Sequence, residues 1–150
     1  MKAHGMAGHL IRRLHQISTQ VFSKHLQDAG FDLTPVQFAA MDAVITEPGI
    51  DQARVAARIA YDRATIGGVI DRLEQKGYVK RNVCRHDRRA REVRPTEKGV
   101  RLFDEILPIV SALQVDILSR LDQIEQARFL ELAAKAIGND LDLASFDEPE

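Results

Sequence analysis

Three closely spaced helix starts, followed by two short strand-like runs, limit what this chain can fold into. Thr34 precedes a proline and is followed three residues later by Gln37, which is the pattern of a capped helix start. Asp51 and Asp62 begin two further segments whose apolar residues recur at helical spacing. Gly77 ends the second of these segments. The order of short helices and a hairpin therefore predicts a mainly α domain.

The remaining elements follow from the same signals. Expected helices are 7–29, 34–46, 51–58, 62–76, 96–121 and 123–137, and expected strands are 78–84 and 91–95. Two capped helices joined by a tight turn and followed by a β-hairpin have the order of a winged helix-turn-helix. The 150 residues suffice for one domain, or for one compact domain with an oligomerisation arm.

Several classes of protein are excluded. A single cysteine, Cys84, cannot form an internal disulfide, so a disulfide-stapled secreted scaffold is ruled out. The apolar runs are too short to span a bilayer, and the first residues lack the apolar segment of a signal peptide. We therefore expect a cytoplasmic protein with no membrane partner. Phosphate-binding loops and hydrolase motifs are missing from the sequence, so we expect neither an enzyme nor a cofactor.

Charge is distributed unevenly along the chain, although the formal net charge is only −1. Residues 51–101 hold 14 Lys and Arg against seven Asp and Glu, whereas residues 102–150 hold three against 11. The most basic stretch is 80–101. A basic middle third in an acidic protein predicts a surface for a polyanion, although such a stretch can also be a solvated loop.

The segment 62–76 has two different sides when residues advance by about 100° each along a helix. The side expected to be buried consists of Ile66, Val69, Ile70 and Leu73. Small residues on the outer side would let the helix approach a DNA groove closely. The expected DNA contacts on this helix are Arg63, Thr65, Gly68, Arg72 and Gln75. Alternatively, Gly67 and Gly68 relieve crowding against a neighbouring helix.

The tip of the expected hairpin is a second candidate contact. An arginine on a short turn can enter the narrow minor groove, where the potential is most negative. A carboxylate beside it can orient its guanidinium group. The candidates at the tip are Asp87, Arg88, Arg89 and Arg91.

The two segments together resemble one family. Residues 87–99, DRRAREVRPTEKG, resemble the wing signature of the MarR family of bacterial transcription regulators, and residues 62–77, DRATIGGVIDRLEQKG, are similar to its recognition helix. The departure is Arg94-Pro95, where the family has Leu or Val before Thr96, and this affects the strand end rather than the wing tip. Segments 33–38 and 60–65 are most similar to repressors of aromatic-acid catabolism, nicotinate-type regulators among them.

The resemblance implies an obligate homodimer that reads double-stranded DNA. In such a dimer, 1–33 and 102–150 form a helical dimerisation region, and 34–101 forms the winged helix-turn-helix. Apolar residues on the helices expected at 96–121 and 123–137 exceed what one small domain could cover, which agrees with a dimer. The two half-sites of a pseudo-palindromic operator would lie about 10 bp apart.

The resemblance also implies a small aromatic carboxylate effector, bound between the dimerisation helices and the winged region. A carboxylate needs a cationic or hydroxyl donor, and a ring needs apolar walls. The candidates are Arg12, Arg13, His15, Ser18, Phe38, Met41 and Tyr61. The alternative for Phe38 and Met41 is a place in the core, and Arg12 and Arg13 could face solvent.

Other modes of action stay open. Cys84 lies beside Arg85, so a redox-sensing regulator is an alternative, although the cysteine near the first helix of peroxide-sensing members is missing. A winged helix used only for protein contacts is another, as is activation instead of repression. The histidines His4, His9, His15 and His25 lack the i, i+4 spacing of a ligand pair, so we expect no metal.

Overall fold

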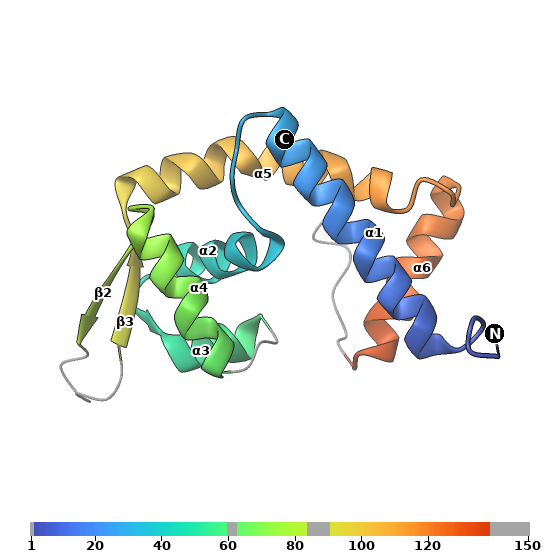
Figure 1. Ribbon diagram of the computed structural model, residues 1–150, viewed down its shortest axis with the longest axis horizontal. Helices are drawn as coiled ribbons and strands as arrows, with labels where there is room; N and C mark the ends of the chain where they lie inside the picture. The colour runs from blue at the N-terminus through green and yellow to red at the C-terminus, as the bar shows by residue number, and fades with distance from the viewer. Residues whose placement is uncertain (1, 60–62, 84–90, 139–150) are drawn as a thin grey trace. The chain divides into compact units, whose positions relative to one another are not determined.

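The structure is a computed structural model that describes residues 2–59, 63–83 and 91–138. The fold is mainly α with a small antiparallel sheet (Figure 1), as predicted from the sequence. Its elements are α1 (Ala7–Asp28), α2 (Pro35–Thr46), β1 (Ile50–Asp51), α3 (Gln52–Arg58), α4 (Arg63–Gln75), β2 (Val79–Val83), β3 (Arg91–Pro95), α5 (Glu97–Ile117) and α6 (Gln123–Ala136). Within these ranges no helix is long and apolar enough to cross a membrane.

The helices begin where the capping residues predicted. The Thr34 hydroxyl accepts from the backbone N–H of Gln37, and the Gln37 side chain accepts from the backbone N–H of Thr34. Asp51 accepts from the N–H of Arg54 at 2.9 Å and caps α3. The predicted cap of α4, Asp62, lies outside the described residues. Local side-chain acceptors thus determine where α2 and α3 start.

The sheet has three strands in the order β1-β3-β2, all antiparallel. The predicted hairpin is confirmed, with Val79 opposite Pro95 and Val83 opposite Arg91. The third strand, Ile50–Asp51, was not predicted, because two residues are too short to show an alternating pattern. It pairs with the outer edge of β3 and connects the end of α2 to the base of the hairpin.

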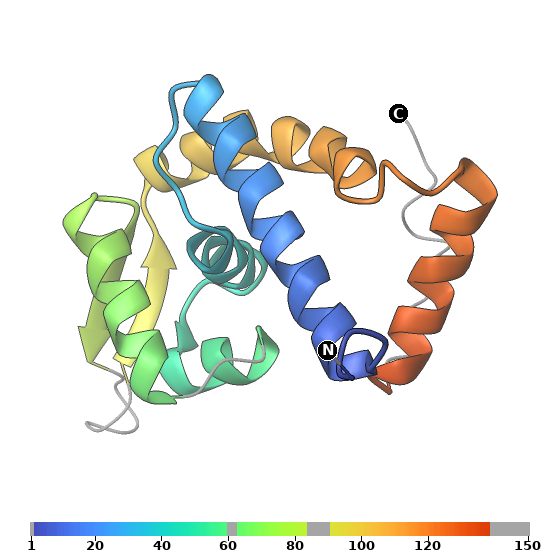
Figure 2. The same ribbon diagram turned by 45° about the vertical axis from the view of Figure 1, so that its right-hand side comes forward.

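The core of this part lies around α2, which contacts α1, α3, α4 and β3. Both views show α4 alongside the hairpin of β2 and β3 (Figure 1, Figure 2). Three aromatic rings pack between the first two helices and α5: Phe38 stacks on Phe103 with 5.1 Å between ring centroids and meets the edge of Phe22 at 6.1 Å. The winged elements are therefore held by one apolar core.

The start of α5 lies very close to the start of β2. Thr96 caps this helix by accepting from the N–H of Gly99, and its own N–H donates to the carbonyl of Tyr78. A Cβ added to Gly99 would lie 2.1 Å from that carbonyl oxygen, so only glycine fits there. The family signature resembled by 87–99 ends on this glycine, and the close approach gives it a physical reason.

α5 ends earlier than predicted, at Ile117 instead of residue 121. The carbonyls of Leu118 and Leu121 accept from the Gln126 side chain at 3.1 Å each, so the chain turns there and continues into α6. Pro108 lies inside α5 and leaves the carbonyl one turn earlier without its helical donor. The predicted helix 96–121 already contained this proline.

The chain divides into two compact units, Met1–Leu113 and Gln114–Glu150. The first contains the winged elements with α1 and most of α5, and the second contains α6. In the second unit, Asp122 and Glu125 form a capping box at the start of α6. The division into a dimerisation region and a DNA-binding region stays a prediction, because it concerns function in a dimer.

Candidate nucleic-acid interface

The two sides predicted for α4 are confirmed. Ile66, Ile70 and Leu73 are at most 1% exposed, and Val69 is also buried. Exposed residues of the same helix are Ala64, Thr65, Gly68, Asp71, Arg72, Glu74 and Gln75. The apolar side anchors α4 in the core, which leaves Thr65, Arg72 and Gln75 exposed on one helix, where long polar side chains can reach an external partner.

Neither glycine of α4 is required by packing among the described residues. A Cβ on Gly68 would meet nothing within 4 Å, and a Cβ on Gly67 would make only an ordinary contact, 3.9 Å from the Gln52 side chain. Glycine in a helix is less stable than alanine by about 1 kcal/mol. The explanation by crowding against a neighbouring helix therefore finds no support here, and close approach to a DNA groove at these glycines stays a prediction.

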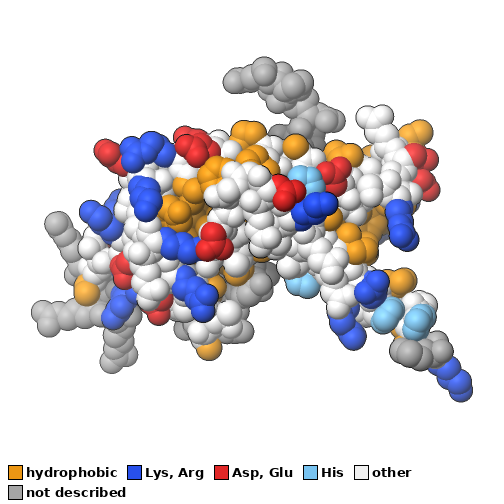
Figure 3. Space-filling model, turned by 45° about the horizontal axis from the view of Figure 1, so that its top comes forward, with side chains coloured by type: hydrophobic (Ala, Val, Ile, Leu, Met, Phe, Trp, Pro, Cys, Tyr) orange, Lys and Arg blue, Asp and Glu red, His pale blue; other side chains and the backbone are white. Residues whose placement is uncertain are grey.

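The hairpin leads toward the basic tip, most of which the structure does not describe. Arg91 is exposed at the first position of β3, opposite Val83. Four predicted residues, Cys84, Asp87, Arg88 and Arg89, lie outside the described residues, as does the side chain of Arg63. On the face in Figure 3, Lys and Arg side chains lie around the winged end, with acidic side chains among them.

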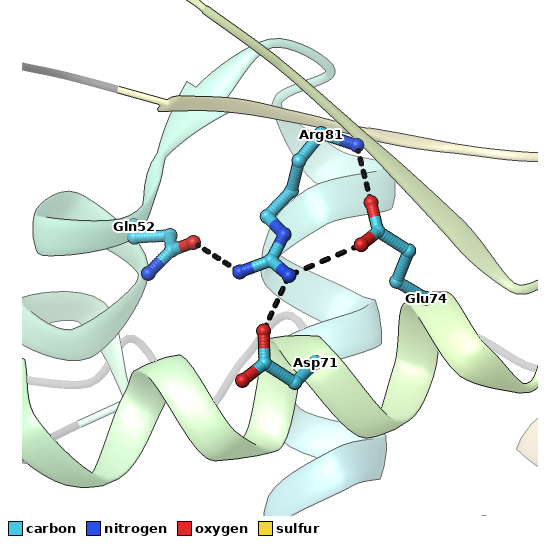
Figure 4. Close-up of polar contacts among 4 residues, drawn as sticks. All are labelled: Gln52, Asp71, Glu74 and Arg81. Atoms are coloured by element: carbon cyan, nitrogen blue, oxygen red, sulfur yellow. Dashed lines mark hydrogen bonds and ion pairs between the residues drawn. The ribbon is translucent and has the colours of Figure 1, made fainter.

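A cluster that the sequence did not reveal joins this hairpin to α4 (Figure 4). Arg81 of β2 donates from Nη1 to Oε1 of Gln52 at 3.0 Å and from Nη2 to Oε1 of Glu74 at 3.1 Å. Nη2 also donates to Oδ1 of Asp71. The second carboxylate oxygen of Glu74 accepts from the backbone N–H of Arg81 at 3.1 Å. One residue of the wing thus contacts the first residue of α3 and two carboxylates of α4.

The hydrogen bond from Arg81 lowers the pKa of Glu74, because it favours the ionised carboxylate, while partial burial and the nearby Asp71 act in the opposite direction. The pKa of Arg81 is raised for the reciprocal reason, chiefly by its hydrogen bond to Glu74. Glu74 and Arg81 are therefore both charged at neutral pH. Two acidic side chains on the exposed part of α4 are matched by one cation.

A second group of charges lies at α3. The Glu47 carboxylate accepts from Arg58 at 2.6 Å and pairs with Arg54 at 2.7 Å, and the hydrogen bond from Arg58 is the main reason that the pKa of Glu47 is lowered. Glu47 and Arg58 line a depression of about 610 Å³ together with residues of α2. Among the predicted effector residues that the structure describes, none lines this depression.

The predicted effector residues lie in different environments. Met41 is fully buried, and Phe38 is half-buried against Phe103. Ser18 is half-buried on α1. Three others, Arg12, Arg13 and His15, are exposed on α1, and Tyr61 lies outside the described residues. The Arg13 guanidinium donates to the Gln16 side chain at 2.9 Å. The structure thus places Met41 in the core, Phe38 half-buried against α5, and the cations on the surface of α1.

Known proteins resemble the chain over nearly its whole length. Residues 31–90 match the model of the MarR family. The transcriptional regulator HosA of Escherichia coli is 31% identical over 135 residues, which are 90% of this chain and 97% of HosA. The HTH-type transcriptional repressor NicR of Pseudomonas putida is 31% identical over 133 residues, which are 89% of this chain and 83% of NicR.

A solved structure gives the same result. The BpsR structure from Bordetella bronchiseptica, which concerns regulation of DNA binding by 6-hydroxynicotinic acid, matches with a TM-score of 0.81 and 27% identity. It covers 91% of this chain and 96% of BpsR. With the winged helix-turn-helix described and these relatives aligned over most of their length, the chain belongs to the MarR family of transcriptional regulators.

Proposed function

We propose that this regulator is a repressor that binds a pseudo-palindromic operator as a homodimer and is released from it by a small aromatic carboxylate. The observation that supports DNA binding is the two-sided character of α4. Its apolar side is buried, while Thr65, Arg72 and Gln75 are exposed. They lie around Gly68, where an added Cβ would meet nothing within 4 Å. Such a helix fits the major groove, and the basic tip of the adjacent hairpin fits the minor groove. Action on DNA agrees with the cytoplasmic location expected from the sequence.

A second copy of the chain would cover apolar side chains that are exposed in each unit taken by itself. On α1 these include Leu10 and Ile11, and in the second unit they include Ile124, which is 82% exposed, and Ile137. Exposed apolar residues in such number indicate an interface. A two-fold dimer presents two α4 helices to half-sites about 10 bp apart.

The effector class rests on the relatives together with the predicted residues. NicR is named as a repressor, and the BpsR structure concerns control of DNA binding by 6-hydroxynicotinic acid. A carboxylate of this kind would be held by Arg13, His15 or Ser18 of α1, and its ring would contact Phe38, Met41 or Tyr61. Binding would favour a state of the dimer that does not fit DNA.

The test is fluorescence anisotropy with a labelled duplex from the region upstream of the protein's own gene. Binding is measured against a random duplex, over a range of salt, with and without nicotinate, 6-hydroxynicotinate and benzoate. We expect tight, salt-sensitive binding to the upstream duplex that one of the acids releases. Binding no tighter than to random DNA at every salt concentration would contradict the proposal and favour a winged helix used for protein contacts.

The effector part of the proposal is tested separately. Binding that no acid releases would contradict it while leaving DNA binding intact. The same titration with oxidised protein and with Cys84→Ser then tests the redox alternative. Release by peroxide in the wild type, and its loss in the variant, would identify Cys84 as the sensor.

A further inference from the structure

The Arg81 cluster lies on the side of the molecule that the proposed function assigns to DNA. The Arg81 side chain is only 13% exposed, whereas those of Asp71 and Glu74 are 52% and 41% exposed. Figure 4 shows the guanidinium group between the two carboxylates of α4 and the Gln52 amide of α3. The cation is therefore enclosed, while the two acids that it contacts are at the surface.

Stability alone does not explain this arrangement. Nε of Arg81 is buried and has no hydrogen-bond partner among the described residues. A buried donor without an acceptor is unfavourable, and ion pairs with half-exposed carboxylates add little to stability. An apolar side chain at this strand position would avoid the unpaired donor. The position instead holds an arginine whose Nη2 contacts both carboxylates.

The two carboxylates are unfavourable neighbours for DNA. Asp71 directly precedes Arg72 and lies one turn after Gly68, on the part of α4 where we propose close approach to the groove. Glu74 directly precedes Gln75. Without a matching cation, two negative charges at this place would repel the phosphates.

We propose, on the basis of the proposed DNA-binding function, that Arg81 is a positioning residue for DNA recognition. Its single positive charge offsets part of the negative charge of Asp71 and Glu74 from behind, and it joins the wing to the recognition helix. The joint has two parts, because Glu74 accepts from both the guanidinium group and the backbone N–H of Arg81. The helix and the hairpin thereby reach major and minor groove as one rigid body.

The shape of the guanidinium group is essential to this role. Nη1 contacts Gln52 while Nη2 contacts Asp71 and Glu74, so the planar fork spans acceptors on α3 and α4. A lysine would supply the same charge from a single nitrogen and could not contact all three. Arg81→Lys therefore keeps the positive charge but loses part of the hydrogen bonding that connects β2 to α3 and α4.

The experiment compares four variants for binding to the duplex from upstream of the gene and to a random duplex, at salt concentrations from about 50 to about 300 mM. They are Arg81→Gln, Arg81→Lys, the triple variant Arg81→Gln/Asp71→Asn/Glu74→Gln and Lys24→Gln. The last is the matched control, since Lys24 is an exposed cation of α1, away from the cluster. Circular dichroism and thermal unfolding establish that each variant is folded.

We expect Arg81→Gln to weaken binding about tenfold or more at low salt, with a deficit that shrinks as salt screens the exposed carboxylates. The triple variant regains affinity to within about threefold of the wild type, because it removes the repelling charges. Arg81→Lys falls between these two. Lys24→Gln stays within about twofold of the wild type, as expected for a distant surface charge.

Two results would overturn the inference while leaving the proposed function intact. One is that Arg81→Gln binds the upstream duplex as tightly as Lys24→Gln and the wild type do. The other is a deficit in Arg81→Gln that is independent of salt and is not regained by the triple variant, which would indicate a structural role alone. A wild-type protein that does not distinguish the upstream duplex from random DNA would instead contradict the proposed function, and this inference with it.

Discussion

Glu74 accepts hydrogen bonds from two different groups of Arg81, and the bond from its guanidinium group is the main reason that the pKa of Glu74 is lowered. One carboxylate oxygen accepts from the guanidinium group of Arg81 and the other from its backbone N–H. These bonds form only in the folded protein, and they hold the pKa of Glu74 below its usual value of 4.5. A group whose pKa is lowered by folding stabilises the fold above its unfolded pKa and loses that effect as the pH falls.

The contribution of Glu74 to the free energy of unfolding should therefore be present at neutral pH and lost at acidic pH. Wild-type protein should lose stability more steeply than Glu74→Gln as the pH falls below about 4.5, through the lowered pKa of Glu74. Urea unfolding at pH 7 and at pH 3 measures the difference. Glu105→Gln, at an exposed position of α5, is the control. Identical pH dependence of stability in the wild type and in Glu74→Gln would contradict a lowered pKa of Glu74.

Two residues of the proposed DNA interface should affect binding in different ways. Arg89→Ala should weaken binding to specific and random duplexes alike and lower the salt slope by about 1, as expected for a contact made by charge. Gln75→Ala should change sequence preference, with about 1–3 kcal/mol of discrimination lost at one base pair. Anisotropy on a set of single-base operator variants separates the two. Equal losses on all duplexes for both variants would reject this division.

At the scale of elements, the contact of α5 with β2 should be intolerant of any side chain. Gly99→Ala should lower the free energy of unfolding by about 3 kcal/mol, because its Cβ would meet the Tyr78 carbonyl at 2.1 Å and backbone must move. Chemical denaturation measures this loss. Gly8→Ala on α1 is the control, since nothing lies within 4 Å of a Cβ there. A loss no larger than that of the control would mean that the contact is looser than described.

The recognition helix should instead gain stability from an added side chain. Gly68→Ala should raise the free energy of unfolding by about 0.5–1 kcal/mol, because the helix gains propensity and the Cβ has no neighbour within 4 Å. The same change should weaken DNA binding if the backbone approaches the groove at this point. Thermal unfolding and anisotropy on one preparation measure both. A variant that is more stable and binds as tightly would remove Gly68 from the interface.

The elements that the sequence predicted are those whose signals are local. Thr34 and Gln37 cap α2 across three residues, and the buried side of α4 repeats within one helix. The strand Ile50–Asp51 could not be predicted, because it exists only through pairing with β3. The role of Arg81 could not be predicted for the same reason. Its partner Gln52 lies 29 positions away, so nothing near Arg81 in the sequence indicates the contact.

At the scale of the whole molecule, the exposed apolar side chains of the second unit should determine the oligomeric state. Ile124→Lys should shift the protein from dimer toward monomer in sedimentation, because a charge replaces a residue that is 82% exposed in one chain. DNA affinity should fall with it. Lys135→Glu, at an exposed polar position of the same helix, is the control. Loss of the dimer in the control alone would place the interface elsewhere.

The glycine at the start of α5 has a mechanical consequence. Because Gly99 has no side chain, its backbone packs directly against the Tyr78 carbonyl, and α5 and the base of the wing are in close contact. We therefore expect any change in the direction of α5 at this end to move the β2-β3 hairpin together with the helix. The compliant point lies farther along the helix, at Pro108, where a backbone hydrogen bond is already missing. We therefore expect α5 to stay rigid at the end that meets the wing and to bend near Pro108.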